Sequence, residues 1–287
     1  MKKVLLYTIF IIILLLSISV VAYPFVSNYL NSLNSDSAVM QYLSISGDTQ
    51  KDFSKVLESA YEYNKELAKT TCVVSDPFSV SEKENADYTS QLSVDNTDVM
   101  ATIEIKAINV NLPIYHGTSE DVLTKGIGHL SSSSLPVGGI GTHSVITGHT
   151  GYSAMRLFSD LDKLAVGDVF TINVCGEVLS YKVDNIATVL PHQTDLLQID
   201  PKKDYVTMVT CTPFGVNSHR LLVRGVRILN DEAQDILSTQ VQPKKSTWTS
   251  EYLYAIIMGV IVMVLILVVF FSTKFVIQIC RKKKNEQ

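Results

Sequence analysis

Cys211 is the side chain of this sequence that is best placed to act as a nucleophile. It follows the β-rich run Tyr205–Thr210 and precedes a Thr-Pro-Phe-Gly segment, so it stands where a strand ends and a loop begins. A thiol attacks a carbonyl as the thiolate, and because its ordinary pKa is about 8.5, a nearby cation or imidazole must lower it. The position also suits a small buried cysteine at a strand end. The chemistry open to Cys211 is therefore acyl transfer, provided that it has partners.

Arg220 is the first candidate partner, because it stands just ahead of the β-rich run Leu221–Ile228. If this run pairs with Tyr205–Thr210 as a neighbouring strand, Arg220 lies close to Cys211. A guanidinium in that place can bind the oxyanion that develops on a substrate carbonyl. The alternative is a solvated arginine at a strand edge.

A histidine is the second partner that this chemistry needs, and six compete for the role: His116, His129, His143, His149, His192 and His219. His149 follows a strand, as Cys211 does, and Gly148 and Gly151 beside it allow other segments to approach closely. His219 would point to the face opposite Arg220, which favours a structural role. A structural role remains open for each histidine, and His149 is the candidate that its context favours.

The region from Val99 onward is predicted to be mainly β, because short runs rich in β-branched and aromatic residues alternate with Gly, Pro and Ser clusters. The runs are Met100–Ile105, Val110–Ile114, His143–Thr147, Val169–Val174, Val178–Val189, Tyr205–Thr210 and Leu221–Ile228. With only short helical stretches such as Ser153–Leu161 between them, they predict a closed β-barrel or a sandwich. Cys175-Gly176-Glu177 is typical of a hairpin turn, which makes Cys175 structural.

The segments that flank this β region have other patterns. Asp52–Thr70 has apolar residues at helical spacing and predicts a surface helix. Cys72–Asp98 is polar and contains Asp76-Pro77, which predicts a long irregular loop. Asn230–Thr249 is polar, with a proline and two lysines, and suggests a tether.

Both ends of the chain predict membrane helices. Val4–Ala22 and Tyr252–Thr273 carry no charge over 19 and 22 residues, about the length that spans a bilayer core. Lysines precede the first run, and Lys274 and Arg281–Lys284 follow the second, so the positive-inside rule places both termini in the cytoplasm. The alternative for the first run is a cleaved signal peptide.

The central region is acidic. Seven of the 24 basic residues and one of the 28 acidic residues lie in the two ends, so 17 basic and 27 acidic residues remain between Tyr23 and Glu251, a net charge of −10. Nucleic acid is therefore not expected as a partner.

The segments around the candidate residues resemble those of the sortase family, specifically its class C, which assembles pili. Residues 210–225, Thr-Cys-Thr-Pro-Phe-Gly-Val-Asn-Ser-His-Arg-Leu-Leu-Val-Arg-Gly, resemble the active-site segment of that class. Thr-Gly-His-Thr-Gly at 147–151, with Leu-Phe-Ser-Asp-Leu-Asp-Lys-Leu at 157–164 and Val-Gly-Asp at 166–168, is similar to the histidine segment, and Leu-Pro-Val-Gly-Gly at 135–139 also fits. The resemblance covers roughly Val99–Leu229, plus the amino-terminal helix and loop.

The resemblance implies a β-barrel cysteine transpeptidase in which Cys211 is the nucleophile, His149 the proton-transfer partner and Arg220 the oxyanion or substrate stabiliser. Sortases cleave an LPxTG-type sorting signal after its threonine and hold the acyl chain as a thioester until an amine resolves it. In the pilus class that amine is a lysine side chain on the next pilin.

The resemblance also implies a lid over the site. Asp76-Pro77-Phe78 resembles the lid motif of class C, and we hypothesise that Asp76 pairs with Arg220 while Phe78 covers Cys211. A proline turn with a surface aromatic residue is the simpler alternative.

The remaining cysteines and acidic residues indicate neither a cofactor nor a metal. Cys72 has no role in the family pattern, Cys280 lies beyond the second apolar run, and no cysteine spacing is typical of a zinc or redox pair. The acidic residues near Glu82 suit a solvated loop, and no acidic partner for His149 is evident. The interpretation therefore includes neither a cofactor nor a metal ion.

The predicted organisation has six parts. They are an amino-terminal membrane segment (1–23), a helix and lid region (24–98), the mainly β sortase-type barrel (99–230), a linker (231–251), a second transmembrane helix (252–273) and a basic cytoplasmic tail (274–287). The expected protein lies in the cell membrane of a Gram-positive bacterium with its barrel outside, and it joins pilins that bear LPxTG-like signals through a lysine amine. Two alternatives remain, namely a sortase that uses a peptidoglycan amine and a non-catalytic membrane-anchored scaffold.

Overall fold

The computed structural model describes residues 2–70, 74–79, 86–95, 97–239, 244 and 246–285. They form two compact units: Met1–Val21 together with Thr247–Gln287, and Ala22–Ser246. The first unit contains apolar helical segments and the second contains the barrel.

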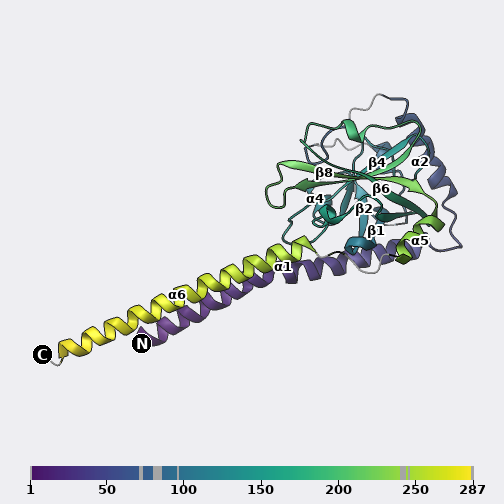
Figure 1. The fold of residues 1–287 in the computed structure, drawn as a ribbon. Coiled ribbons are helices and arrows are strands. Elements are labelled where there is room, and N and C mark those ends of the chain that lie inside the picture. Colours follow the sequence, from purple (N-terminus) through teal and green to yellow (C-terminus); the bar gives the residue numbers. More distant parts are fainter. Residues whose placement is uncertain are drawn as a thin grey trace. The chain divides into compact units, whose positions relative to one another are not determined.

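Within the described residues, eight strands close into a barrel (Figure 1). In chain order they are β1 (Val99–Ile105), β2 (Val110–His116), β3 (Ile127–His129), β4 (Thr142–Thr147), β5 (Val169–Val174), β6 (Glu177–Val189), β7 (Asp204–Thr212) and β8 (His219–Ile228). Around the barrel they follow the order β1-β2-β3-β4-β7-β8-β6-β5. The prediction of a closed, mainly β barrel is confirmed, and every predicted run lies within or overlaps a strand.

The helices are α1 (Lys2–Ser46), α2 (Ser54–Leu67), α3 (Ala86–Thr89), α4 (Glu120–Leu123), α5 (Asn230–Thr239) and α6 (Thr247–Asn285). Short 3-10 turns stand at Lys106–Ile108, Leu161–Lys163 and Asp195–Leu197. The predicted helix at Asp52–Thr70 is confirmed as α2, a few residues shorter.

Most of the barrel interior is filled by aliphatic and aromatic side chains from alternate strand positions. Phe170 stacks on Tyr181 with ring centroids 5.5 Å apart, and both are almost fully buried. A Cβ on Gly225 would lie 2.5 Å from the Phe170 ring, so a glycine is needed where β8 passes this pair.

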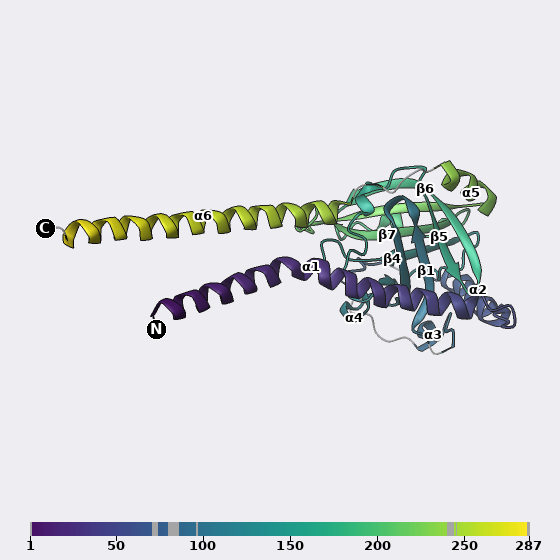
Figure 2. The same ribbon diagram turned by 90° about the horizontal axis from the view of Figure 1, so that it is seen from below.

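Helix α1 continues well past the apolar run at its start. It passes through Pro24 and reaches Ser46, and its carboxyl-terminal part lies along the side of the barrel that contains β1 (Figure 2). The hydroxyl of Tyr42 donates a hydrogen bond to Met100 O (3.0 Å) and accepts one from Cys175 N–H (2.9 Å). Burial raises the pKa of this phenol, so it stays a neutral donor. The helix is therefore stabilised by its contact with the barrel.

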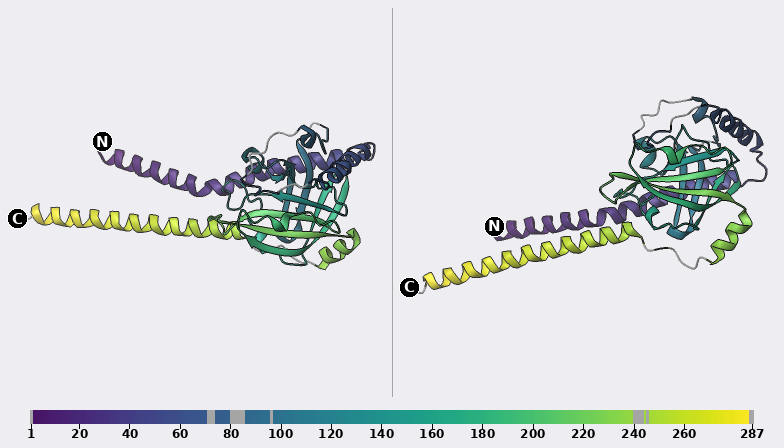
Figure 3. Two further views of the ribbon diagram at one scale, coloured as in Figure 1. Left: turned by 90° about the horizontal axis from the view of Figure 1, so that it is seen from above. Right: turned by 45° about the horizontal axis from the view of Figure 1, so that its top comes forward.

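Two expectations about local structure are wrong. Ser153–Leu161 is not a helix, because its backbone is held in turns by side chains from elsewhere: Arg156 N–H donates to Asn28 Oδ1 at 2.9 Å, and Ala154 O accepts from Asn31 Nδ2 at 2.9 Å. The first part of the expected tether forms helix α5, which buries Ala233 and lies beside β5 and β6 (Figure 3).

The expected hairpin at Cys175 is confirmed. Cys175 and Gly176 both have positive φ, the backbone that a two-residue turn between β5 and β6 requires. A Cβ on Gly176 would lie 2.5 Å from Ser46 O at the end of α1. Burial raises the pKa of the Cys175 thiol to about 11, so this cysteine is structural.

Two helices among the described residues are long and apolar enough to cross a membrane, over Tyr7–Ser46 and Trp248–Lys274. The first overlaps the apolar run Val4–Ala22, and the second contains the run Tyr252–Thr273. The sequence-based domain boundaries and membrane topology stay predictions.

Candidate active site

The register of β7 and β8 brings Cys211 and Arg220 together. The two strands are antiparallel neighbours, and Cys211 and Arg220 are direct Cα partners in the ladder. The turn that follows Cys211 is tight, since Pro213 O accepts the N–H groups of both Val216 and Asn217 at 3.0 Å. The predicted strand pairing is thus confirmed, and it places a guanidinium beside the thiol.

The parallel pairing of β4 with β7 brings His149 to the same level. The ladder reaches Thr147 opposite Val209, and the two chains stay together beyond it because Gly148 N–H donates to Val209 O at 3.2 Å. Thr210 Oγ1 then donates to Gly148 O at 2.7 Å. His149 directly follows Gly148, and Cys211 directly follows Thr210. Both side chains therefore stand at the same end of the paired strands β4 and β7.

Gly148 is required by the packing beneath the histidine. A Cβ at this position would lie 2.6 Å from Ile127 Cδ1 and 3.0 Å from the ring of Phe158. Phe158 N–H in turn donates to His149 O at 3.1 Å, which fixes the backbone that carries the imidazole. The expectation that glycine here permits a close approach is confirmed.

Cys211 and Arg220 lie on a face of their strands that is covered by a small apolar cluster outside the main core. Side chains two residues apart share a face of a strand, so Cys211 shares one with Val209 and Arg220 shares one with Leu222. Val209 and Leu222 belong to a small cluster that also contains Val74, with Phe78 packed against it. The segment 74–79 thus lies against the surface that carries Cys211 and Arg220.

Asp76 forms a bidentate ion pair with Arg220. The Nε and Nη2 groups of Arg220 donate to Asp76 Oδ1 and Oδ2, each at 2.8 Å. The two side chains are only 6% and 13% exposed, so little water competes for this pair. The hypothesised contact between Asp76 and Arg220 is present.

Phe78 lies between the two basic candidates. Its ring centroid is 5.0 Å from Arg220 Cζ and 5.8 Å from the centroid of the His149 ring. A hydrogen bond from Ser79 N–H to Asp76 O (3.0 Å) closes a tight turn that holds Asp76 and Phe78 on the same side. We name residues 76–79 the lid turn.

The lid turn changes the electrostatics of the thiol. Burial raises the pKa of Cys211, Arg220 lowers it, and the negative charge of Asp76 raises it again, so that the net direction is upward. The hydrogen bonds from Arg220 to Asp76 raise the pKa of that guanidinium. In this closed arrangement the thiol is held neutral near pH 7, and much of the charge of Arg220 is directed at Asp76.

His149 has one further neighbour that sequence reasoning missed. Glu120, on α4, places Oε2 3.5 Å from His149 Nε2. The Nε2 atom is buried and has no hydrogen-bond partner among the described residues. The ring of Tyr152 also packs against the His149 imidazole in a tilted arrangement, with ring centroids 5.7 Å apart. The only sequence signal for Glu120 is its place in the short acidic segment after β2, which points to no particular partner.

Three of the other histidines have structural contacts. The ring of His129 bonds to Ser134 O and Tyr88 Oη, and that of His143 bonds to Gln198 O and Thr207 Oγ1, at 2.7–2.9 Å. Burial lowers the pKa of both His129 and His143 to about 4. His116 Nε2 lies 2.8 Å from Gln91 O. These contacts agree with a structural role for the three.

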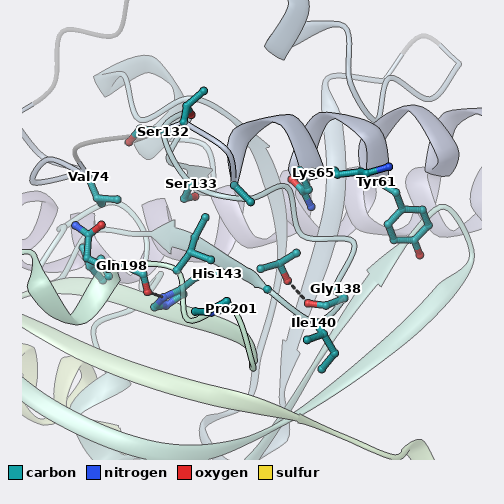
Figure 4. Close-up of a pocket in the computed structure, with 18 residues that line it drawn as sticks. Tyr61, Lys65, Val74, Ser132, Ser133, Gly138, Ile140, His143, Gln198 and Pro201 are labelled. Atoms are coloured by element: carbon teal, nitrogen blue, oxygen red, sulfur yellow. Dashed lines mark hydrogen bonds between the residues drawn. The ribbon is translucent and has the colours of Figure 1, made fainter.

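A cavity of about 630 Å³ lies between α2 and the barrel (Figure 4). Tyr61 and Lys65 of α2, Ser133, Ile140 and His143 are among its lining residues. Cys211, His149 and Arg220 are not among its lining residues. The cavity therefore does not mark the chemistry.

Among the described residues, no group of three or more His, Cys, Asp or Glu side chains could hold a metal ion. Cys175 and Cys211 are free thiols. Cys72 lies outside the described residues.

A family model described as "Sortase domain" matches residues 103–228. Three solved structures are similar to this chain. Sortase C1 from Streptococcus agalactiae is 50% identical, with 68% of this chain and 99% of that chain covered and a TM-score of 0.61. Sortase C-1 from Actinomyces oris is 46% identical, with 62% and 99% covered and a TM-score of 0.59. A lid mutant of sortase A from Corynebacterium diphtheriae is 44% identical, with 63% and 96% covered and a TM-score of 0.56.

The chain belongs to the sortase family. The predicted resemblance to class C is confirmed by the sortase C structures, and family membership confirms the predicted class of enzyme, a cysteine transpeptidase. The chain spans just under two thirds of the length of the curated relatives that it matches.

Proposed function

We propose that this protein is a membrane-anchored pilus sortase. It cleaves an LPxTG-like sorting signal after the threonine and transfers the acyl chain to a lysine side-chain amine of the next pilin. The observation that carries the proposal is the meeting of Cys211, Arg220 and His149 at the ends of β7, β8 and β4, with the lid turn closed on them.

In the first half of the reaction Cys211 Sγ attacks the threonine carbonyl carbon as the thiolate. Arg220, once released from Asp76, donates hydrogen bonds to the oxyanion of the tetrahedral intermediate. His149 gives a proton to the glycine nitrogen, the threonine–glycine C–N bond breaks, and a thioester with Cys211 remains.

In the second half the lysine amine attacks the thioester carbonyl. His149 takes a proton from the attacking nitrogen, and the C–S bond breaks to regenerate the thiolate. The products are an isopeptide bond and the free enzyme. This chemistry requires no metal or cofactor, because the protein groups balance every proton and bond.

The lid turn regulates access in this proposal. With Asp76 on Arg220 and Phe78 against His149, the oxyanion site is occupied and the proton-transfer residue is covered. A substrate must displace both side chains before it reacts. A lid mutant is known among the similar structures, that of sortase A from Corynebacterium diphtheriae, and this supports the assignment of a lid in this part of the family.

The two apolar helices support the proposed anchoring. We assign residues 4–22 and 252–273 to the membrane and both termini to the cytoplasm, as the basic flanks indicate, so that the barrel lies outside the cell. An external barrel can meet pilins as they emerge from export. The net charge of −10 argues against nucleic acid as a partner.

The full chain in detergent micelles tests the chemistry. Incubated with an LPxTG peptide, wild type and Asp76→Ala are expected to gain the mass of the acyl fragment on Cys211, and Cys211→Ala is expected to gain none. Absence of the adduct in both reactive forms would favour the non-catalytic scaffold.

A competition experiment tests the acceptor. A peptide with a lysine side-chain amine and a peptidoglycan stem-peptide amine are offered together to the preformed thioester. Pilus assembly predicts the lysine product, whereas predominance of the stem-peptide product would identify a cell-wall-anchoring sortase.

A further inference from the structure

Glu120 is held next to the proton-transfer histidine by the packing of its helix. Leu123 of the same short helix, α4, is 2% exposed and lies against β3, where a Cβ on Gly128 would come within 3.0 Å of its side chain. The N–H groups of Val122 and Leu123 both donate to Ser119 O at 3.0 Å. The position of the Glu120 backbone is therefore determined by the barrel, although its side chain is 75% exposed.

The Nε2 atom of His149 faces this carboxylate and is otherwise unsatisfied. The distance to Glu120 Oε2 is 3.5 Å without hydrogen-bond geometry, and Nε2 has no hydrogen-bond partner among the described residues. A buried polar atom without a partner is costly, so a small rotation that brings Nε2–H onto the carboxylate is favoured. Phe78 of the lid turn packs on the same ring, and its departure frees that rotation.

We propose that Glu120 is a positioning residue for His149. When the lid turn opens, the Glu120 carboxylate accepts the Nε2–H of His149, which fixes the tautomer and leaves Nδ1 to exchange protons with Cys211 and the amine. The negative charge also stabilises the imidazolium that forms in each half-reaction. The inference rests on the proposed function, since it assigns a partner within that site.

The expected effect is modest because the Glu120 side chain is largely exposed. Exposed ion pairs contribute up to about 1 kcal/mol, which corresponds to about fivefold in rate. A buried carboxylate partner of a catalytic histidine would have a far larger effect.

The kinetic test compares the full chain in detergent with three variants, using an LPxTG peptide and a lysine peptide. Glu120→Gln is expected to lower kcat about fivefold with KM unchanged, and Glu120→Asp to recover part of that loss. Asp121→Asn is the matched control, because Asp121 is the neighbouring exposed carboxylate on the same helix, and its kcat is expected to equal that of wild type. An equal loss in Asp121→Asn would overturn the proposal, because net charge would then explain it.

A spectroscopic test does not depend on turnover. With ¹⁵N-labelled histidine in the full chain carrying Asp76→Ala, the His149 signals, assigned by comparison with His149→Gln, are expected to show protonation at Nε2. Adding Glu120→Leu is expected to shift them toward a mixture of tautomers. Unchanged signals would refute the role of Glu120. If neither wild type nor Asp76→Ala forms an acyl adduct but the expected signals are seen, the proposed function is refuted and the positioning role is supported.

Discussion

The strength of the ion pair between Asp76 and Arg220 predicts how strongly the lid turn suppresses Cys211. The replacement Asp76→Ala removes both acceptors of the bidentate contact, at 2.8 Å each, and leaves Arg220 free to turn toward the thiol. We expect Cys211 to react faster with a small alkylating reagent in this variant. The reason is that the closed state loses its main polar contact, while Phe78 alone must hold the lid turn in place.

The magnitude follows from the geometry of the pair. A hydrogen bond to a charged group contributes about 1.5–3 kcal/mol, and water recovers part of two such bonds when the lid turn opens. A net loss of about 2 kcal/mol from the closed state corresponds to an increase of about 30-fold in the open population and in the alkylation rate. The loss of the Asp76 charge also lowers the pKa of Cys211, because that charge raises it in the closed state.

The assay follows alkylation of the full chain in detergent by mass mapping of the peptide that contains Cys211, since the chain has other cysteines. Asp184→Ala is the matched control, because Asp184 makes the same bidentate pair with Arg224, at 3.0 and 2.8 Å, at a distance from the thiol along β8. Alkylation of this control is expected to match wild type. A rate for Asp76→Ala within twofold of wild type would show that the lid turn does not limit access to Cys211.

Three further predictions concern the elements that support the site. His129 and His143 stay neutral in the fold with pKa values of about 4 but bind protons when unfolded below about pH 6.5, so stability is full above that pH and falls as the pH drops toward 4. Chemical denaturation should show that the free energy of unfolding is lower at pH 5.0 than at pH 7.5, by about 2 kcal/mol for each of these two histidines. Replacing the exposed His192 by Gln should leave this difference unchanged. A denaturation midpoint that does not depend on pH would contradict the prediction. Gly148→Ala should cost about 1–3 kcal/mol by overpacking and lower turnover, measured by thermal melting and peptide cleavage, whereas normal values would show that the loop shifts freely. Asn28→Ala should cost about 1 kcal/mol and reduce kcat, since Asn28 holds the turns that follow the histidine; unchanged kcat with reduced stability would limit Asn28 to a structural role.

Much of the barrel could be predicted from the sequence because its strands are local patterns. The alternation of apolar residues and the turn chemistry at Cys175 depend only on neighbouring residues, and both are confirmed. The meeting of Cys211 and Arg220 was also predictable, since a short loop between adjacent strands forces such residues together. The three residues of β3 are too few to show a pattern and were missed.

Other features depended on contacts between distant segments. Helix α1 extends to Ser46 because Tyr42 bonds to the barrel, and no residue near Tyr42 in the sequence signals that contact. Residues 153–161 have helical spacing, but Asn28 and Asn31 bond to their backbone and hold it in turns.

The candidate site shows the same division between local and distant information. The sequence by itself determined the residue types, the strand ends that carry Cys211 and His149, and the aspartate–aromatic pair of the lid turn. Only the tertiary structure decided that Asp76 lies 2.8 Å from Arg220 and that Glu120 lies 3.5 Å from His149. The physical reason is that strand pairing and helix packing bring together side chains whose separation along the chain contains no information about their distance in space.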